Sequence, residues 1–202
     1  MRRAINWFGL GAGITTMLLI VVSLFVPWWV VQVGDGLFQI NTSPLNTNFS
    51  LAGSPSFAVP IIWALNLASI LTLAVGGILI FVYSLFPAKP YGRKLLDFSY
   101  KKPLYAVVFF VASLLALIIV MRSAFGVDVP LVGAQTIQLP KSMTLGTTIT
   151  ALVTADFEWP FWLAIAAAGL CVATRLFHQR AVNGKQSNLY FPSTPPLPPQ
   201  PN

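Results

Sequence analysis

The chain has 202 residues, of which 56% are hydrophobic and only 8% are charged, whereas about 25% are charged in an ordinary soluble domain. This composition excludes a soluble globular domain and indicates a membrane protein with room for a few spans of about 20 residues, but for no second folded domain. The net charge of +7 does not indicate nucleic-acid binding, because the basic residues lie beside apolar segments and would face lipid headgroups.

Four apolar segments predict an all-α membrane protein with a bundle of four transmembrane helices. The first segment is too long for the apolar region of a signal peptide and has no cleavage site, so we expect a retained signal-anchor helix. The expected organisation in chain order is a cytoplasmic N-terminus (1–4), a helix (5–31), an external loop (32–58), a helix (59–86), a cytoplasmic basic loop (87–103), a helix (104–121), an external loop (122–156), a helix (157–176) and a Pro-rich, disordered cytoplasmic tail (177–202).

The distribution of basic residues predicts the orientation in the cell membrane. Short loops rich in Lys and Arg stay on the cytoplasmic side of a bilayer. With both termini and the 87–103 loop inside, only Arg122 and Lys141 of the twelve Lys and Arg residues lie outside. The residues expected inside are Arg2, Arg3, Lys89, Arg93, Lys94, Lys101, Lys102, Arg175, Arg180 and Lys185.

Both expected external loops contain strand signals. In the first loop, β-branched and aromatic residues flank Gly34-Asp35-Gly36, and Asp-Gly readily adopts the positive φ angles of a hairpin turn. In the second loop, apolar and polar residues alternate over 135–139 and 143–153. We therefore expect a small extracellular β subdomain built from both loops.

Two possible glycosylation sites fall in the first external loop. Asn41-Thr42-Ser43 and Asn48-Phe49-Ser50 both match the N-x-[ST] acceptor pattern. Such triplets also arise by chance in loops rich in Asn, Ser and Thr, so modification of Asn41 and Asn48 stays an open alternative.

The cores of the four apolar segments contain no Asp, Glu, Lys, Arg or His. Pumps and ion-coupled transporters place ionisable groups within the bilayer, so this absence argues against a pump. Cys171 is the only cysteine, which excludes an internal disulfide, and it is expected to be a small buried side chain. The only histidine, His178, is expected to be solvated or to face the headgroups. We therefore predict no catalytic residue, no metal site and no cofactor.

Uncharged polar residues occur in the segments, and they are expected to form helix contacts more often than to line a pore. Asn66 is the main exception, because an amide in lipid must find a partner; it is a candidate pore or polar-contact residue.

Small residues recur at every fourth position of the apolar segments, which puts them on one helical face and lets helix backbones approach closely. We expect these faces to pack within this chain's own bundle, with docking onto another subunit as the alternative. The residues are Gly9, Gly13, Ala64, Ala68, Thr72, Gly76, Ala112, Ala116, Ala164 and Ala168.

The first loop carries a limited family signature. Trp28-Trp29 ends the first apolar segment, and Gly36-Leu37-Phe38 follows in the β-prone loop. With four spans and cytoplasmic ends, this pattern resembles the claudin and peripheral-myelin type of four-span protein. That family has Gly-Leu-Trp followed by two cysteines, whereas this chain has Phe38 and neither cysteine, so no functional residue is transferred. The resemblance implies a non-enzymatic protein whose outer sheet and helix faces contact other proteins.

Together these features predict a non-catalytic structural or accessory subunit of a membrane complex or cell-surface assembly. Its partners would be the lipid bilayer and a membrane protein or further copies of this chain. The alternative function is a small oligomeric channel or facilitator with an uncharged pore.

Overall fold

The computed structural model describes residues 5–34, 38–45, 47–51, 54–55, 60–87, 89–139 and 149–178. The helices in this part of the chain are α1 (Trp7–Val22), α2 (Pro60–Leu85), α3 (Gly92–Ser99), α4 (Lys102–Phe125) and α5 (Trp159–Leu176). The strands are β1 (Trp29–Val33), β2 (Phe38–Thr42), β3 (Thr47–Leu51), β4 (Ser54–Pro55), β5 (Gly133–Leu139) and β6 (Ile149–Phe157).

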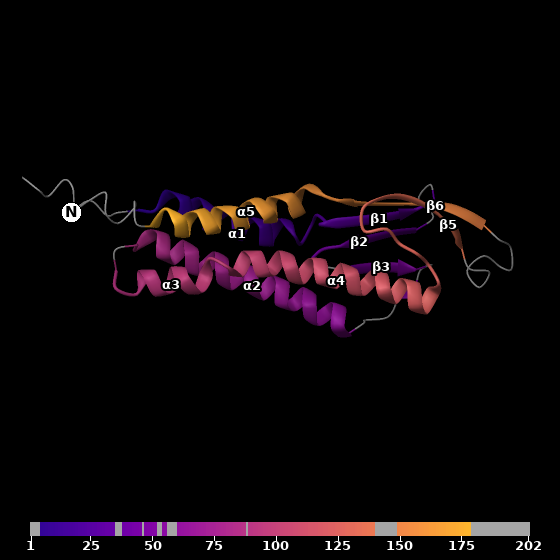
Figure 1. Ribbon diagram of the computed structural model, residues 1–202, viewed down its shortest axis with the longest axis horizontal. Coiled ribbons are helices and arrows are strands. Elements are labelled where there is room, and N and C mark those ends of the chain that lie inside the picture. Colours follow the sequence, from indigo (N-terminus) through magenta and orange to yellow (C-terminus); the bar gives the residue numbers. More distant parts are fainter. Residues whose placement is uncertain are drawn as a thin grey trace, which may run out of the picture.

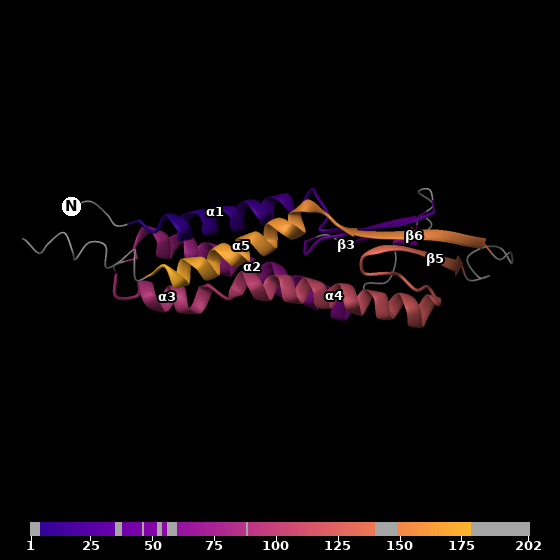
Figure 2. The same cartoon turned by 45° about the horizontal axis from the view of Figure 1, so that its top comes forward.

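Four long helices form an elongated bundle, and the sheet extends beyond one end of it (Figure 1). The short helix α3 lies at the opposite end. Helix α2 packs against both α1 and α4, and α5 contacts α1 and α4 (Figure 2). The chain therefore has a helical part and a β part arranged along one axis.

Three helical segments are long and apolar enough to cross a membrane, namely Pro60–Leu85, Gly92–Ser123 and Trp159–Leu176. Helix α1 is also apolar but has 16 residues. At 1.5 Å per residue it spans about 24 Å, against a hydrocarbon thickness of about 30 Å. The expected helix 5–31 is therefore wrong at its C-terminal end, where Trp29 already belongs to β1.

Local chemistry explains why α1 stops early. Pro27 has no backbone N–H and disfavours helical geometry at Val26, so the helix cannot continue through this point. The Ser23 hydroxyl donates back to the Leu19 carbonyl at 2.6 Å and closes the last turn. Beyond Pro27, the β-branched Val30 and Val31 favour a strand.

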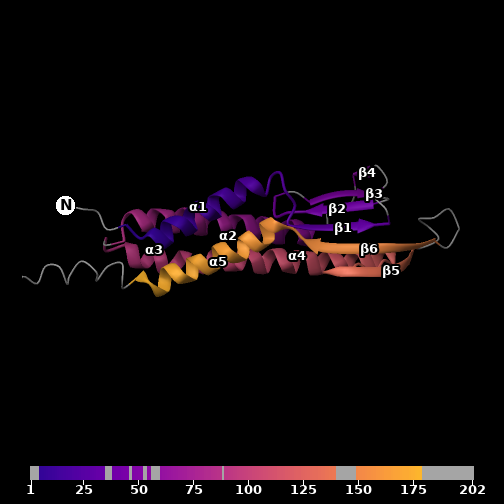
Figure 3. The ribbon, with the colours of Figure 1, turned by 90° about the horizontal axis from the view of Figure 1, so that it is seen from above.

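The strands form one antiparallel sheet in the order β4-β3-β2-β1-β6-β5 (Figure 3). Strand β1 pairs with β2 on one side and with β6 on the other. The first inter-helix segment thus supplies β1 to β4, and the last supplies β5 and β6. This pairing confirms the prediction of a small sheet shared by the two loops. Gly34 has φ 62 at the end of β1, as the hairpin requires, while residues 35–37 lie outside the described part.

One hydrophobic core joins the sheet to the bundle. Its members come from β1 and β6, such as Val31 and Val153, and from the second half of α4, such as Leu114 and Leu117. Trp28 is 0% exposed and lies 4.9 Å from Phe110 between ring centroids, in an edge-to-face arrangement. Because this core is continuous, the sheet packs directly on the helices.

The expected basic loop at 87–103 contains the helix α3. Leu96 and Ser99 are 0% exposed on its inner face, whereas Arg93 and Lys94 are exposed. Hydropathy alone does not indicate this short amphipathic helix, because its charged residues lower the mean hydropathy of the segment. Helix α4 begins at Lys102, close to the expected start, and extends to its C-cap Gly126, which has φ 67, rather than ending at residue 121.

Candidate functional site

The face of the sheet that points away from the core carries a cluster of polar side chains. Along β1, Val31 and Val33 point into the core, so the intervening Gln32 lies on the outer face. Gln32 is paired in register with Gln39 of β2 and with Thr154 of β6. The three side chains therefore form a row across the centre of the sheet.

A second row lies next to the first. Val30 pairs with Asn41 on β2 and with Asp156 on β6. The Gln39 amide donates a hydrogen bond of 3.0 Å to Asn41 Oδ1, which links the two rows. Amides and hydroxyls can both donate and accept hydrogen bonds, so this face, the outer β face (Gln32, Gln39, Asn41, Thr154), is suited to binding another polar surface.

The outer β face carries few ionisable side chains in the part that the structure describes. Asp156 is its one ionisable side chain there, on an exposed strand position. Among all described residues, no three His, Cys, Asp or Glu side chains are close enough together to hold a metal ion. The neutral amides and hydroxyls of the outer β face can form hydrogen bonds with another molecule.

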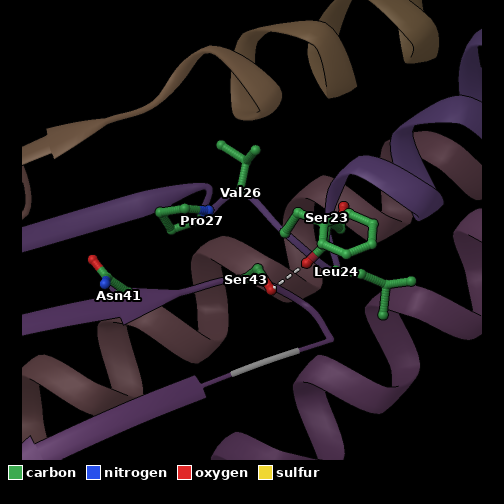
Figure 4. A pocket seen from close by; sticks show the side chains of 7 residues that line it. Ser23, Leu24, Val26, Pro27, Asn41 and Ser43 are labelled. Carbon is green, nitrogen blue, oxygen red and sulfur yellow. Dashed lines mark hydrogen bonds between the residues drawn. The ribbon is translucent and has the colours of Figure 1, made fainter.

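A hydrogen-bonded junction joins α1 to the sheet. The Trp28 indole N–H donates to Ser23 Oγ at 2.8 Å, and Ser43 Oγ donates to the Ser23 carbonyl at 2.9 Å. Beside the junction lies a pocket of about 90 Å³, well below the roughly 300 Å³ of small ligand sites. Its lining residues are Ser23, Leu24, Phe25, Val26, Pro27, Asn41 and Ser43 (Figure 4). The junction therefore holds the helix and sheet together and is too small for a cofactor.

A polar cluster ties the helices together at the opposite end. The Tyr83 hydroxyl of α2 accepts a hydrogen bond of 3.2 Å from Asn6 Nδ2, and it lies 2.5 Å from His178 Nδ1. Asn6 Oδ1 in turn caps α1 by accepting from the Gly9 N–H at 3.2 Å. With His178 neutral and Nδ1 unprotonated, Tyr83 donates to that nitrogen. Residues before α1, within α2 and after α5 are thereby connected.

An ion pair adds α3 to this end of the molecule. Asp97 Oδ1 lies 2.8 Å from Arg175 Nε on α5, and Asp97 Oδ2 lies 3.9 Å from Arg93 Nε. The sequence led us to expect a solvated histidine in this region, but the structure places His178 against Tyr83 instead. No local pattern could have indicated this contact, because the two residues are 95 positions apart in the chain.

We expect the stability of this end to depend on pH through His178. Burial, with the nearby Arg175 and Arg93, lowers the pKa of His178 from its ordinary value of 6.5, while Asp97 opposes this shift. The unfolded chain then binds more protons than the folded chain below about pH 6.5, so stability falls as the pH drops through that range.

The thermal unfolding midpoint in detergent should therefore decrease between about pH 7.5 and about pH 5.5. His178→Gln should remove this part of the decrease, since His178 is the only histidine. If His178→Gln and the wild-type protein show the same dependence of the unfolding midpoint on pH, His178 is not the group responsible.

The small residues of α1 lie at its contact with α2. A Cβ on Gly13 would come within 2.9 Å of Phe81 Cα, and a Cβ on Gly9 would overlap Ser84 Oγ. Gly77, which the four-residue pattern did not include, faces Thr16 in the same contact, with a Cβ distance of 2.8 Å to Thr16 Cγ2. The two helices thus approach closely along α1.

The small residues of α2 are distributed differently. Gly76 is buried, and a Cβ there would lie 2.8 Å from Pro103 Cδ of α4. Ala68 and Thr72 are half-buried and Ala64 is exposed. The exposure of this row therefore increases from Gly76 toward the N-terminal end of α2. On α4, Ala112 and Ala116 are half-buried. On α5, Ala164 and Ala168 are buried, with 0% and 4% exposure.

The polar residues within the helices mostly bond to carbonyl groups. Ser69 Oγ donates to the Ala106 carbonyl of α4 at 2.7 Å, and Thr72 Oγ1 donates to the Ala68 carbonyl at 2.8 Å. Thr16 and Ser113 likewise bond to carbonyls in their own helices. Asn66 is buried at 5% exposure on the inner face of α2.

The two sequon asparagines lie on neighbouring strands. Asn41 of β2 and Asn48 of β3 are paired in register. Asn41 is half-exposed, whereas Ser43, the hydroxyl residue of its triplet, is buried at 2% exposure. The side chain of Asn48 lies outside the described part of the structure.

The sequence matches no protein-family model, and no curated protein is significantly similar to it.

Proposed function

We propose that this chain is a non-catalytic, multi-pass protein of the cell membrane that serves as a structural or accessory subunit. In this proposal all four long helices span the bilayer, the sheet is external, and both termini with α3 are cytoplasmic. The outer β face binds a partner protein. At the level of topology the proposal keeps the resemblance to claudin and peripheral-myelin type proteins, supported by one sheet built from both loops.

The observation that carries the proposal is the continuous core beneath the sheet. Val31, Val153 and Leu114 belong to the same cluster of buried residues, so the outer β face is presented on a packed support. A preorganised surface loses little conformational entropy on binding, which favours a contact role. The neutral amide and hydroxyl groups of this face supply hydrogen bonds without catalytic chemistry.

The channel alternative has weaker support from the described residues. A pore with uncharged walls needs hydroxyl or amide groups that are available to the permeating solute. In this chain Ser69 and Thr72 donate their hydroxyl protons to backbone carbonyls. Their bonds hold helices together, as in ordinary membrane packing.

The experiment is to extract the protein in a mild detergent and to determine its native mass and the identity of copurifying subunits. The chain alone contributes 22.0 kDa, so a stoichiometric partner should be resolved beyond the detergent contribution. The double variant Gln32→Arg/Thr154→Arg should lose the partner while keeping its thermal midpoint, because both residues lie on the outer β face.

The control is Ser123→Arg, an exposed position near the end of α4 and away from that face. It should retain the partner. Isolation of a monomer without partners, or partner retention by the double variant, would contradict a role for this face. Solute flux through reconstituted vesicles would favour the channel.

The proposed orientation makes a separate prediction about accessibility. In a Cys171→Ser background, a cysteine at Gln32 should react with an impermeant thiol reagent in intact cells, because the sheet would be external. A cysteine at Lys94 should react only after the cells are permeabilised, since the basic segment would be cytoplasmic. Labelling of a cysteine at position 94 in intact cells would contradict the proposed orientation and would place the basic segment outside.

A further inference from the structure

Basic and aromatic side chains alternate along α3 and into the start of α4; Tyr91, Lys94 and Phe98 are exposed, whereas Lys102 is half-buried beside Gly76 of α2. Tyr91 precedes α3, Lys94 and Phe98 belong to α3, and Lys102 is the first residue of α4; successive members are three or four residues apart. That spacing places Tyr91, Lys94 and Phe98 on one side of α3. Tyr91 is 48% exposed and Phe98 is 58% exposed, and Lys102 Nζ lies 4.5 Å from the centroid of the Phe98 ring. We call these four residues the α3 face.

The charges of the described residues are divided unequally between the two ends. At the α3 end the cations are Lys89, Arg93, Lys94, Lys101, Lys102 and Arg175, and the one acid there, Asp97, already contacts Arg175 and Arg93. At the sheet end Arg122 is paired with Asp128 at 3.2 Å, and Asp156 and Glu158 are further acids. The α3 end therefore attracts anions, and Lys94, Lys101 and Lys102 form no ion pair in the described part of the structure.

Exposed aromatic residues indicate where this end lies relative to a bilayer. Trp7, the first residue of α1, is 72% exposed, and Tyr105, in the first turn of α4, is 42% exposed. Both helices begin at the α3 end of the bundle (Figure 1). Aromatic rings concentrate at the boundary between hydrocarbon and headgroups. Lysine side chains near that boundary extend their ammonium groups toward the headgroups while their methylene groups stay in apolar surroundings.

We propose that the α3 face is a binding surface for the headgroups of anionic phospholipids in the same bilayer that the helices cross. Lys94 and Lys102 contact the lipid phosphate, while Tyr91 and Phe98 enter the boundary with the acyl chains. The alternation of rings and cations matches helices that lie in the plane of a membrane surface. A nucleic acid or an acidic protein would approach from solvent and would leave the two rings without an apolar environment.

The contacts of α3 explain how lipid binding would act on the fold. Helix α3 is joined to α5 through the Asp97–Arg175 pair and packs its Leu96 side against the bundle. A lipid held by Lys94 and Lys102 therefore fixes the end of the bundle at a defined depth. This role is independent of any partner at the outer β face.

The test uses the purified full chain in detergent, delipidated and then incubated with equal amounts of phosphatidylglycerol and phosphatidylcholine. Native mass spectrometry counts the lipids that stay bound. The wild-type protein should retain phosphatidylglycerol preferentially, and Lys94→Gln/Lys102→Gln should reduce this preference about thirtyfold. Phe98→Ser should weaken retention of both lipids, because it removes the apolar contact without changing charge.

The matched control is Arg122→Gln, which removes one exposed cation at the sheet end and should keep the wild-type lipid preference. Unchanged preference in the double lysine variant would overturn the proposal. Displacement of phosphatidylglycerol by millimolar inorganic phosphate would overturn it as well, since the site would then bind free anions. If the preference for phosphatidylglycerol persists in millimolar phosphate and is lost only at high salt concentration, headgroup binding is supported, because salt screens the attraction between lysine and lipid phosphate.

Discussion

Trp28→Ala is expected to be strongly destabilising, lowering the free energy of unfolding by about 3 to 5 kcal/mol. Trp28 is 0% exposed, and its ring lies 4.9 Å from the Phe110 ring and 6.4 Å from the Phe161 ring. Truncation leaves a cavity between α4, α5 and the sheet. It also removes the donor that bonds to Ser23 Oγ.

The measurement is the thermal unfolding midpoint in detergent, together with protease sensitivity of the sheet. Trp63→Ala is the matched control, because Trp63 is 64% exposed and the substitution removes the same atoms from a surface. The sheet should become sensitive to protease in Trp28→Ala and stay resistant in Trp63→Ala. Equal midpoints for the two variants would show that Trp28 does not join the sheet to the bundle.

The second expected effect is a loss of stability in Gly13→Ala of about 1 to 3 kcal/mol by overpacking. The new Cβ would lie 2.9 Å from Phe81 Cα and 3.0 Å from Phe81 N. These are backbone atoms, so the contact is relieved only by moving α1 away from α2. The rest of that contact would then be weakened, including the packing of Gly77 on Thr16.

Gly11→Ala is the control on the same helix. No atom lies within 4 Å of a Cβ placed at Gly11, and replacing a helical glycine with alanine adds about 0.5 to 1 kcal/mol of stability in water. The two substitutions should thus shift the thermal midpoint in opposite directions. A neutral or stabilising Gly13→Ala would contradict the close approach of α1 and α2.

The β signals in the sequence were sufficient to predict a sheet, because they are local. The alternation over 143–153 and the Gly34-Asp35-Gly36 turn signal each depend on neighbouring residues. Strand β6 covers the described part of the first, 149–153, and strands β1 and β2 flank the second, while 143–148 and 35–37 lie outside the described residues. The same local reasoning overextended the first helix through 5–31, because hydropathy does not distinguish a buried strand from a buried helix. Pro27 was the available signal for the earlier end.

The polar sites depended on contacts that sequence periodicity does not encode. Asn6, Tyr83 and His178 come from three distant parts of the chain, and Asp97 reaches Arg175 across the bundle. Spacing of four residues places small residues on a shared helical face, but it does not say which face meets a neighbouring helix. Gly77 shows the difference, since it lies in the α1–α2 contact although it stands one residue from the predicted row.

Composition and local periodicity were enough to predict a membrane protein with β-prone segments between apolar ones, because both reflect burial in lipid or in a sheet. The strand order, with β1 between β2 and β6, and the shared core that supports the outer β face emerge only in the folded chain. The same is true of α3 and the orientation of its Tyr91–Lys102 face. The physical reason is that pairing and packing are set by which distant surfaces are complementary, and this information is distributed over the whole chain.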